Sequence, residues 1–546
     1  MMDLWYKNAV IYCLDVKSFM DASGDGWGDF QGLTDRLDHL EALGVTCVWL
    51  NPFYPSPNRD NGYDISDFYG VMERLGSPGD FVAFSREARD RGLKVIIDLV
   101  VNHTSSEHPW FKASREDPDG PYGDFYVWSK EKPKDITKGI VFPGVQDAVW
   151  THDETRDAWY MHRFYKYQPD LNISNPAVRE EIMKIMGYWL ELGVWGFRID
   201  AAPFLIEYEG LDEEPDRDPL LLLTEMRDFL SWRRAGGIFM AEANITRDKA
   251  PGYFGGHENG TEERLHMLLD FPANQAMWLA FARADARPIA EALRSRPQKV
   301  PGQAQWANFL RNHDELSLDK LSDDERQEVF DAFGPEKDMQ LYGRGLRRRL
   351  APMLGGDTER LKMAHSLMLA LPGTPVMWYG DEIGMGEDLS LEEREAVRTP
   401  MQWADERHAG FSFDGTDLVR PVVEDGPMGY HETNVASQRG RAGSLLTQVQ
   451  HLIRTRRACP EIGWGETEII VGLPDCVLGL VCSWRGGRVL TLHNLSDQPQ
   501  EVQAPLDGAS HLVPLMGDAG EALEADNRIA MTPYGYCWFR VDGERR

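Results

Sequence analysis

Three carboxylates, Asp200, Glu242 and Asp314, stand at or just beyond the end of an apolar run that predicts a buried strand. Buried strands are normally apolar throughout, so a charged residue at the end of each needs an explanation. Arg198 lies two positions before Asp200, and alternation along a strand places both side chains on one face. An arginine beside a carboxylate lowers the pKa of that carboxylate and keeps it ionised, which suits a nucleophile. For this stretch alone, a structural ion pair explains the residues equally well.

Paired carboxylates in one pocket suit the cleavage of glycosidic bonds. One carboxylate attacks the sugar, and a second, protonated one gives its proton to the leaving oxygen. Glu242 follows the apolar run 238–241, a setting that raises the pKa of a carboxyl as a general acid requires. We expect Asp314 to bind ring hydroxyls, and His103 and His313 to donate hydrogen bonds to the same sugar.

The elements that must position these residues are strands that alternate with helices. Such alternation indicates βα units and a parallel sheet. The expected strands cover residues 8–16, 45–50, 94–101, 194–199, 238–242, 265–270, 306–311 and 375–379. We therefore expect an α/β protein with a (β/α)8 (TIM) barrel, in which chemistry takes place at the carboxyl ends of the strands.

The expected barrel is interrupted once and followed by a second kind of sequence. Residues 105–172 are aromatic, proline-rich and irregular, which is typical of an inserted lid, called domain B here. The barrel parts are then residues 1–104 and 173–462, which together form domain A. Residues 463–546 carry short alternating strands with turn signals and predict a C-terminal antiparallel β-sandwich, domain C.

Composition limits the partners of this chain. The 546 residues carry a formal net charge of −30, which argues against nucleic acid and anionic membranes as partners. We find no run of about 18 apolar residues that would span a membrane and no signal-peptide pattern at the start. The six cysteines lack CxxC spacing and resemble reduced thiols. We expect a cytoplasmic protein.

The segment after the first strand has the layout of a cation-binding loop. Glycines for a tight bend alternate with oxygen-bearing groups, as in the first part of a calcium loop. The candidate ligands are Asp21, Ser23, Asp25, the Trp27 carbonyl and Asp29. The ion would be Ca²⁺ or Mg²⁺. The alternative is a polar turn that caps the helix expected to begin near Gly32.

Four segments resemble the four sequence regions of the α-amylase family, glycoside hydrolase family 13. They read DLVVNH, GFRID, MAEAN and FLRNHDE, in the order of that family. The resemblance implies a retaining double displacement with Asp200 as nucleophile, Glu242 as acid/base and Asp314 as transition-state stabiliser. It also implies a set of residues that hold the sugar whose bond is cleaved: Tyr63, Asp64, His103, Arg198, His313 and Arg398. Asp98 matches a buried structural position near that site.

Within the family, the stretches HRFYKYQPDLN, GRGLRRRLAPML and VRTPMQW are similar to the trehalose synthases, which interconvert maltose and trehalose. That similarity implies no organic cofactor and a second calcium ion between domain B and the barrel. Its ligands would be Asn102, Asp170, the Phe204 and Leu205 carbonyls, and Glu207. The expected substrates are small α-glucosides, namely maltose, trehalose, sucrose or maltooligosaccharides, and a homodimer is compatible with the resemblance.

Two loops depart from the trehalose synthase pattern. They are the segment after Glu209, which reads GLDEEPDRDP, and residues 132–150. Both are expected to shape the acceptor side of the pocket and the access of water, which decides between isomerisation and hydrolysis. An α-1,4-preferring α-glucosidase or transglucosylase is therefore the alternative function. A non-catalytic, amylase-like interaction protein is a remote one, because such relatives lose catalytic carboxylates.

Overall fold

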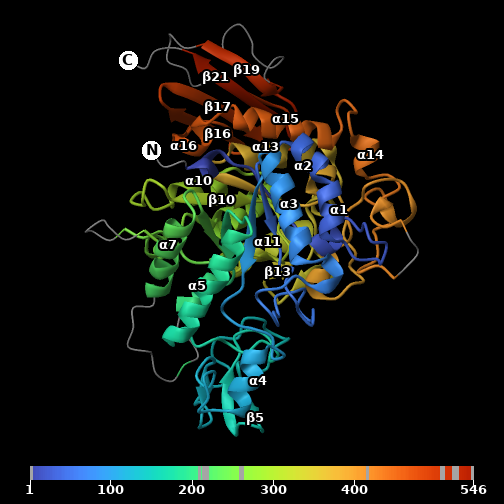
Figure 1. Ribbon diagram of the computed structural model, residues 1–546. Coiled ribbons are helices and arrows are strands. Elements are labelled where there is room, and N and C mark those ends of the chain that lie inside the picture. The colour runs from blue at the N-terminus through green and yellow to red at the C-terminus, as the bar shows by residue number, and fades with distance from the viewer. Residues whose placement is uncertain are drawn as a thin grey trace.

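The computed structural model describes residues 4–206, 211, 220–256, 263–413, 417–503, 511–518 and 528–542 (Figure 1). Glu207 and most of the segment 207–219 lie outside the described residues, so the calcium ligand and the altered loop expected there are not placed.

Parallel strands close a barrel, in the order β1-β14-β10-β9-β8-β7-β3-β2. Its strands are β1 (Ile11–Leu14), β2 (Cys47–Leu50), β3 (Lys94–Leu99), β7 (Gly196–Ile199), β8 (Ile238–Ala241), β9 (Met267–Leu269), β10 (Gln305–Phe309) and β14 (Thr374–Trp378). Each expected strand is present, and the predicted (β/α)8 barrel is confirmed. Seven of these strands are shorter than expected by one to five residues, and β14 has the expected length but begins one residue earlier. The strands are buried along almost their whole length, which is why they read as continuous apolar runs.

Helices surround the barrel. The α-helices are α1 (Phe30–Asp35), α2 (Leu37–Leu43), α3 (Pro78–Asp90), α5 (Pro176–Glu191), α6 (Ala202–Ile206), α7 (Leu221–Arg233), α8 (Ala250–Phe254), α9 (Phe271–Arg283), α10 (Arg287–Arg294), α11 (Asp323–Phe333), α12 (Leu350–Met353), α13 (Thr358–Ala370), α14 (Val435–Gln438), α15 (Leu445–Arg457) and α16 (Glu461–Trp464). The 3-10 helices are η1 (Trp5–Asn8), η2 (Val16–Ser18), η3 (Glu73–Leu75), η4 (Lys337–Met339), η5 (Asp381–Ile383), η6 (Glu393–Val397) and η7 (Arg407–Gly410). The helix expected to begin near Gly32 is followed at once by a second one, since α1 and α2 are separated only by Arg36.

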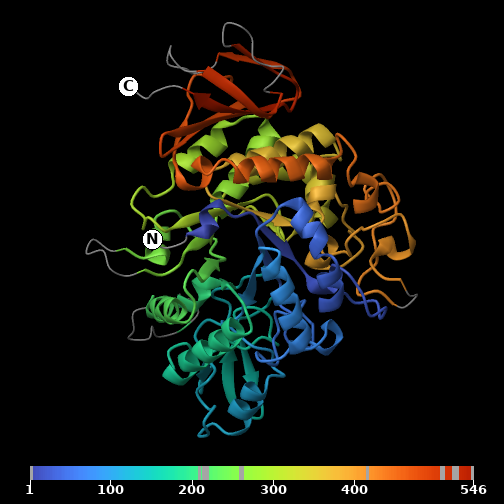
Figure 2. The same cartoon turned by 45° about the horizontal axis from the view of Figure 1, so that its top comes forward.

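Residues 105–172, expected to be irregular, contain a small ordered unit. It comprises α4 (Pro109–Glu116) and a sheet of β4 (Trp128–Ser129), β6 (Ala158–Met161) and β5 (Trp150–Asp153). A bridge between His103 and Asp170 ties this unit to the segment that follows β3, and a bridge between Tyr126 and Leu171 lies within the unit. It projects from the barrel at the end opposite the C-terminal sheets (Figure 2). Three very short strands explain why periodicity alone did not reveal it.

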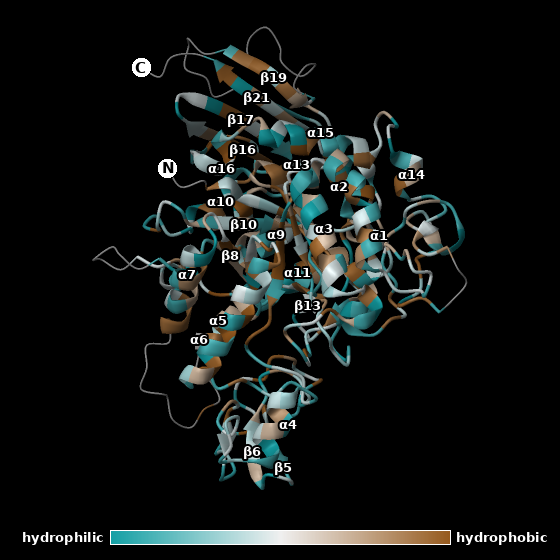
Figure 3. Cartoon of the chain, in the orientation of Figure 1, coloured by the Kyte–Doolittle hydropathy of each residue, from teal (hydrophilic) through white to brown (hydrophobic). Residues whose placement is uncertain are grey.

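The C-terminal part contains a five-stranded antiparallel sheet, in the order β15-β16-β17-β21-β19, and the pair β18-β20. The strands are β15 (Glu466–Ile469), β16 (Val477–Trp484), β17 (Gly487–Asn494), β18 (Gln500–Gln503), β19 (His511–Gly517), β20 (Arg528–Met531) and β21 (Tyr536–Asp542). Side chains from both sheets, such as Leu492 and Ile529, share one core, as expected of a sandwich. Apolar and polar residues are interspersed along these strands (Figure 3). Among the described helices, none is long and apolar enough to cross a membrane.

Candidate active site

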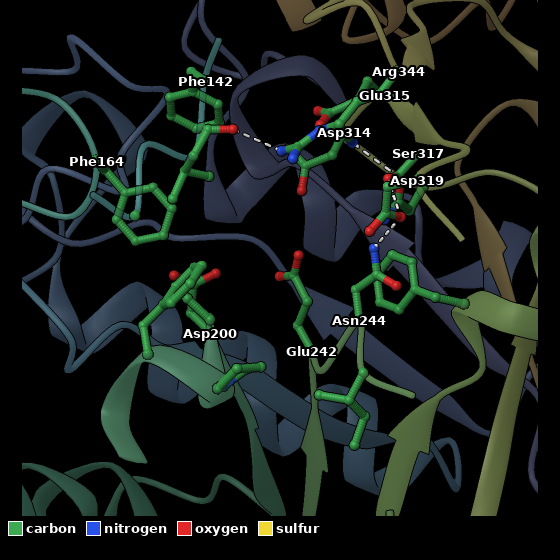
Figure 4. A pocket seen from close by; sticks show the side chains of 18 of the residues that line it. Phe142, Phe164, Asp200, Glu242, Asn244, Asp314, Glu315, Ser317, Asp319 and Arg344 are labelled. Atoms are coloured by element: carbon green, nitrogen blue, oxygen red, sulfur yellow. Dashed lines mark hydrogen bonds between the residues drawn. The ribbon is translucent and has the colours of Figure 1, made fainter. Parts of the chain in front are cut away.

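The three carboxylates singled out by the sequence face one cavity at the carboxyl ends of the strands (Figure 4). The cavity has a volume of about 600 Å³. Asp200 follows β7, Glu242 follows β8, and Asp314 lies in the loop after β10. The backbone of Glu242 continues the sheet, since its N–H donates to the Ile199 carbonyl at 3.0 Å. The barrel therefore converts three distant sequence positions into one acidic pocket.

Arg198, in the middle of this acidic group, is completely buried. Its Nη1 lies 2.5 Å from Asp98 Oδ1 and 2.6 Å from Asp200 Oδ1, and its Nη2 contacts Glu242 Oε2. Asp98 and Arg198 are direct neighbours across the β3–β7 pair. Asp98, which is buried and does not line the cavity, thus holds the Arg198 guanidinium that contacts Asp200 and Glu242.

The electrostatic setting of Asp200 differs from the sequence expectation. Burial raises the pKa of its carboxyl to about 6, although Arg198 acts in the opposite direction, and the nearby charge of Asp314 adds to the increase. The expected net lowering was wrong because the loss of hydration outweighs a single arginine that also serves Asp98. A pKa of about 6 still leaves Asp200 ionised at neutral pH.

At Asp314, neighbouring positive groups outweigh the effect of burial on the pKa. Burial opposes its ionisation, but His313 and the arginines Arg394 and Arg398 together hold the pKa of this carboxyl well below its usual range. His313 Nε2 lies 3.1 Å from Asp314 Oδ2, and Arg394 and Arg398 lie 2.8 and 3.0 Å from Asp314 Oδ1. Asp314 is therefore a fixed negative charge at the pocket wall.

The predicted sugar-binding residues are brought together, in two layers. Tyr63 and His103 line the cavity, while His313 and Arg398 are buried behind it. The Tyr63 hydroxyl lies 2.7 Å from His313 Nε2, and the two rings stack. His103 Nε2 lies 3.1 Å from the Tyr63 carbonyl oxygen, and burial lowers the pKa of His103 to about 4, so its ring is neutral at neutral pH.

Asp64 does not line the pocket, contrary to the prediction. Its buried carboxylate accepts hydrogen bonds from the Ser56 hydroxyl at 2.8 Å and from the N–H groups of Arg59 and Asp60 at 3.1 and 3.2 Å. It therefore organises the turn, and Asp60 lines the cavity instead. The sequence feature that could have distinguished Asp60 from Asp64 is the Asn61-Gly62 pair. This pair predicts a tight turn, and a turn changes which of the neighbouring carboxylates faces the site.

Asp60 and Arg394 are pocket residues that the sequence analysis missed. Asp60 Oδ2 accepts a hydrogen bond from Gln168 Nε2 at 2.9 Å, and Asp60 Oδ1 lies 3.5 Å from Arg394 Nη2. Because Arg394 also contacts Asp314, it links two carboxylates that lie on different loops, the one after β2 and the one after β10. Nothing local in the sequence distinguishes Arg394 from a solvated arginine, so only the tertiary structure identifies it.

The lid segment, residues 139–142 of domain B, forms one wall of the cavity. Phe142 stacks on Tyr342 with ring centroids 4.8 Å apart, and it also contacts Tyr165 at 5.1 Å. The hydroxyls of Tyr165 and Tyr342 both donate to Glu393 Oε2, at 2.7 and 3.1 Å. Arg344 Nη2 donates to the Val141 carbonyl at 2.7 Å. Side chains from two barrel loops therefore hold the lid segment over the pocket.

A polar network forms the wall opposite the lid segment (Figure 4). Asp319 Oδ1 accepts hydrogen bonds from Asn244 Nδ2 at 2.7 Å and from the Ser317 hydroxyl at 2.9 Å. Asn244 follows Glu242 by two positions, so this network fixes the segment that carries the expected general acid. The wall therefore presents hydrogen-bonding groups to the cavity.

The loop of residues 21–29 has the hydrogen bonds of a polar turn. Asp21 accepts from the N–H groups of Gly24 and Gly26 at 2.7 and 2.8 Å. Asp29 caps α1, since its Oδ1 accepts from Gly32 N–H at 2.7 Å. The carboxylate of Asp25 accepts from the N–H of Trp27, and Ser23 Oγ donates to Asp21. Within the described residues, no three acidic, histidine or cysteine side chains cluster as metal ligands.

At the second expected cation site, the described candidate ligands line a common cavity. Asn102 and Asp170 are in contact, with Nδ2 and Oδ1 3.3 Å apart. Both line a cavity of about 270 Å³ between domain B and the barrel, together with Phe204 and Leu205. Burial raises the pKa of Asp170 to about 7 despite Arg163. The described donors are oxygen-bearing groups of the kind that Ca²⁺ prefers.

The closed barrel and its acidic pocket define an enzyme that acts on glycosides. The alpha amylase catalytic domain matches residues 12–332 and 346–465. The chain belongs to the α-amylase family, glycoside hydrolase family 13.

Similarity to individual proteins places the chain more precisely within the α-amylase family. The chain is 41% identical over 548 residues to the trehalose synthase/amylase of Mycobacterium tuberculosis, which covers 98% of this chain and 90% of that protein. It is 39% identical over 550 residues to the trehalose synthase of Pimelobacter sp., with 98% and 96% coverage. The solved trehalulose synthase from Pseudomonas mesoacidophila superimposes with a TM-score of 0.78 at 26% identity, covering 98% of this chain and 99% of that one. The chain is thus a trehalose synthase-like member of its family.

Proposed function

We propose that this enzyme interconverts maltose and trehalose by moving one glucosyl group within the bound disaccharide, with some hydrolysis as a side reaction. The observation that carries the proposal is the roofed pocket, in which three carboxylates share a cavity of about 600 Å³ under the lid segment. Cavities of about 300–1,000 Å³ hold small ligands. The similarity to trehalose synthases supports the same activity.

In the first step, Asp200 attacks the anomeric carbon of the glucosyl unit while Glu242 gives its proton to the glycosidic oxygen. The bond to the second glucose breaks, and a covalent β-glucosyl ester on Asp200 forms. Arg198 contacts both carboxylates through the two ends of one guanidinium, which supports the separation of about 5–5.5 Å that a retaining mechanism requires. Asp314 would stabilise the positive charge that develops on the sugar ring.

In the second step, the released glucose turns within the pocket and attacks the ester through its anomeric hydroxyl. Glu242 takes the proton of that hydroxyl, and Asp200 leaves as a carboxylate. Water that reaches the ester instead gives two glucose molecules. The lid segment therefore decides the outcome, since a closed pocket excludes competing nucleophiles.

Small α-glucosides are the proposed substrates. Maltose and trehalose come first, with sucrose and maltooligosaccharides as further candidates. A solved complex of a trehalulose synthase variant with its substrate sucrose has a TM-score of 0.79 to this chain, at 26% identity, which supports disaccharides as ligands of such a pocket.

An α-glucosidase or transglucosylase is the second candidate. The chain is also 30% identical over 562 residues to the oligo-1,6-glucosidase of Halalkalibacterium halodurans, so the same architecture supports hydrolysis. The two functions share the first step and differ only in which nucleophile attacks the ester.

Product analysis on maltose separates the two. We expect trehalose to dominate over free glucose when products are followed over time by anion-exchange chromatography. Glucose or longer oligosaccharides as the main products would contradict isomerisation and favour the second candidate. Trehalose as the starting substrate should give maltose, and its complete conversion to glucose would refute the proposal in the same way.

We also propose that Ca²⁺ stabilises the junction between domain B and the barrel. Asn102 and Asp170 would hold the ion with the carbonyls of Phe204 and Leu205, and the ion would act structurally. We expect about one Ca²⁺ per chain by elemental analysis, and a Tm that falls by several degrees in chelator and recovers with Ca²⁺. Asp170→Asn should remove this dependence. Two Ca²⁺ ions per chain would indicate that the loop 21–29 binds an ion as well. If no Ca²⁺ is bound and the Tm does not change in chelator, both sites are contradicted.

A further inference from the structure

Lys17 is a fully buried lysine just beyond β1, at the catalytic end of the barrel. Its ammonium donates to the Asn61 carbonyl at 2.6 Å and to Asn58 Oδ1 at 3.0 Å. Both acceptors belong to the turn of residues 58–62, more than 40 positions further along the chain. A long flexible side chain buried in one geometry loses most of its conformational entropy, so these contacts must offset that loss.

The turn of residues 58–62 cannot hold its shape by itself. Asn58, Asn61 and Gly62 have φ values of 59°, 49° and 97°. Left-handed conformations of residues other than glycine are costly and persist only where the surroundings enforce them. A Cβ on Gly62 would lie 2.9 Å from the Pro52 carbonyl and 3.5 Å from Lys17 Nζ, so the turn is pressed closely against the lysine.

Asn61 is held through its backbone carbonyl and through both polar atoms of its side chain. Its carbonyl accepts from Lys17, its Nδ2 donates to Asp15 Oδ2 at 3.1 Å, and its Oδ1 accepts from Arg420 Nη2. Asp15 lies 4.0 Å from Lys17 and 3.9 Å from Arg420, which balances part of the buried positive charge. Burial lowers the pKa of Lys17 to about 8, partly opposed by Asp15, so the ammonium is protonated at neutral pH.

The clamped turn carries Asp60 into the pocket and leads directly to Tyr63. We propose that Lys17 is a positioning residue for the glucosyl-binding end of the pocket, which acts by fixing the turn that presents Asp60 and Tyr63. This inference rests on the proposed glucosyl chemistry. Lys17 does not line the cavity, so its effect must pass through the turn.

The chain offers a matched control in Lys7. Lys7 also flanks β1, but at the opposite end of the barrel, and its ammonium likewise donates to a backbone carbonyl, that of Gly302, at 2.6 Å. Lys7→Met and Lys17→Met each remove a hydrogen bond of 2.6 Å to a backbone carbonyl, and both should lower the free energy of unfolding. Only Lys17→Met should disturb the site.

Two measurements test the proposal on the full chain. Hydrogen exchange should be at least tenfold faster in residues 58–64 of Lys17→Met than in wild type, and unchanged there in Lys7→Met. With p-nitrophenyl α-glucoside, which requires only glucosyl binding and cleavage, KM should rise at least tenfold in Lys17→Met while kcat changes less than about threefold. A loss of binding that is uniform in ground and transition states has this signature.

A milder variant keeps the test valid if Lys17→Met fails to fold. Asn58→Gly removes one acceptor of the ammonium while tolerating the positive φ. It should raise the exchange rate of residues 58–64 and the KM by at least threefold, and Lys17→Arg should keep KM closer to wild type than Lys17→Met does. Unchanged exchange and KM in Asn58→Gly, or an equal KM change in Lys7→Met, would overturn the proposal. The proposed isomerisation is tested separately, by product analysis of the wild-type enzyme. Hydrogen exchange at the turn is measured without substrate, so the two proposals can fail independently.

Discussion

Replacing Phe142 by alanine should turn the enzyme toward hydrolysis. Phe142 is buried in the lid segment, stacks on Tyr342 and contacts the ring of Tyr165, and the Arg394 guanidinium lies 5.1 Å from its ring centroid. The contacts with Tyr342 and Arg394 join domain B to barrel loops over the pocket, whereas the contact with Tyr165 lies within domain B. Their loss should leave the three carboxylates in place and open the roof above them.

The size of the effect follows from the contacts. Each aromatic pair is worth about 0.5–1.5 kcal/mol beyond its buried area, and a buried Phe→Ala change costs about 3–5 kcal/mol in total. If at least half of that cost falls on lid closure, the open state gains about 1.5–2.5 kcal/mol. Every 1.4 kcal/mol is a factor of ten in an equilibrium, so the ratio of glucose to trehalose formed from maltose should rise by about tenfold or more.

The assay is the initial rate of both products by anion-exchange chromatography, well below the Tm of each variant. Phe111→Ala is the matched control, because Phe111 is equally buried in domain B and contacts Tyr126, Trp128 and Tyr160, but does not line the cavity. It should lower stability without changing the product ratio. An unchanged ratio in Phe142→Ala, or the same change in both variants, would refute the reasoning that the lid segment controls water.

Three further predictions concern the carboxylates. Asp200→Asn should retain the fold by circular dichroism and lose activity by at least about 1,000-fold, as expected when a covalent nucleophile is removed, and near-normal turnover would exclude Asp200 from that role. Because Asp200 must be ionised and burial raises its pKa to about 6, kcat/KM should decline tenfold per pH unit below pH 6, whereas an acid limb near pH 4 would contradict this assignment. Asp60→Asn should lower kcat/KM by at least about 100-fold with little change in Tm. Asp64→Asn should instead destabilise the fold by about 1–3 kcal/mol, because turn hydrogen bonds are lost, and should keep most of the activity. The reverse pattern would show that Asp64 binds the sugar.

The sequence by itself determined the barrel and the three carboxylates at its strand ends. Both follow from local patterns, since a buried strand needs a continuous apolar run, and a charge at its end is conspicuous. The sandwich strands were equally readable, because alternation with turn signals is a short-range property. The short strands of domain B were not, since strands as short as Trp128–Ser129 leave no period to detect.

The tertiary structure alone decided which groups meet in the pocket and what charge they carry. Asp60 faces the cavity and Asp64 does not, because the positive φ angles at Asn61 and Gly62 set the direction of the turn. The pKa of Asp200 depends on how deeply the barrel buries it and on an arginine that Asp98 shares. The lid contacts between Phe142 and Tyr342 join residues 200 positions apart. Burial and long-range packing are properties of the folded chain, so no local pattern in the sequence encodes them.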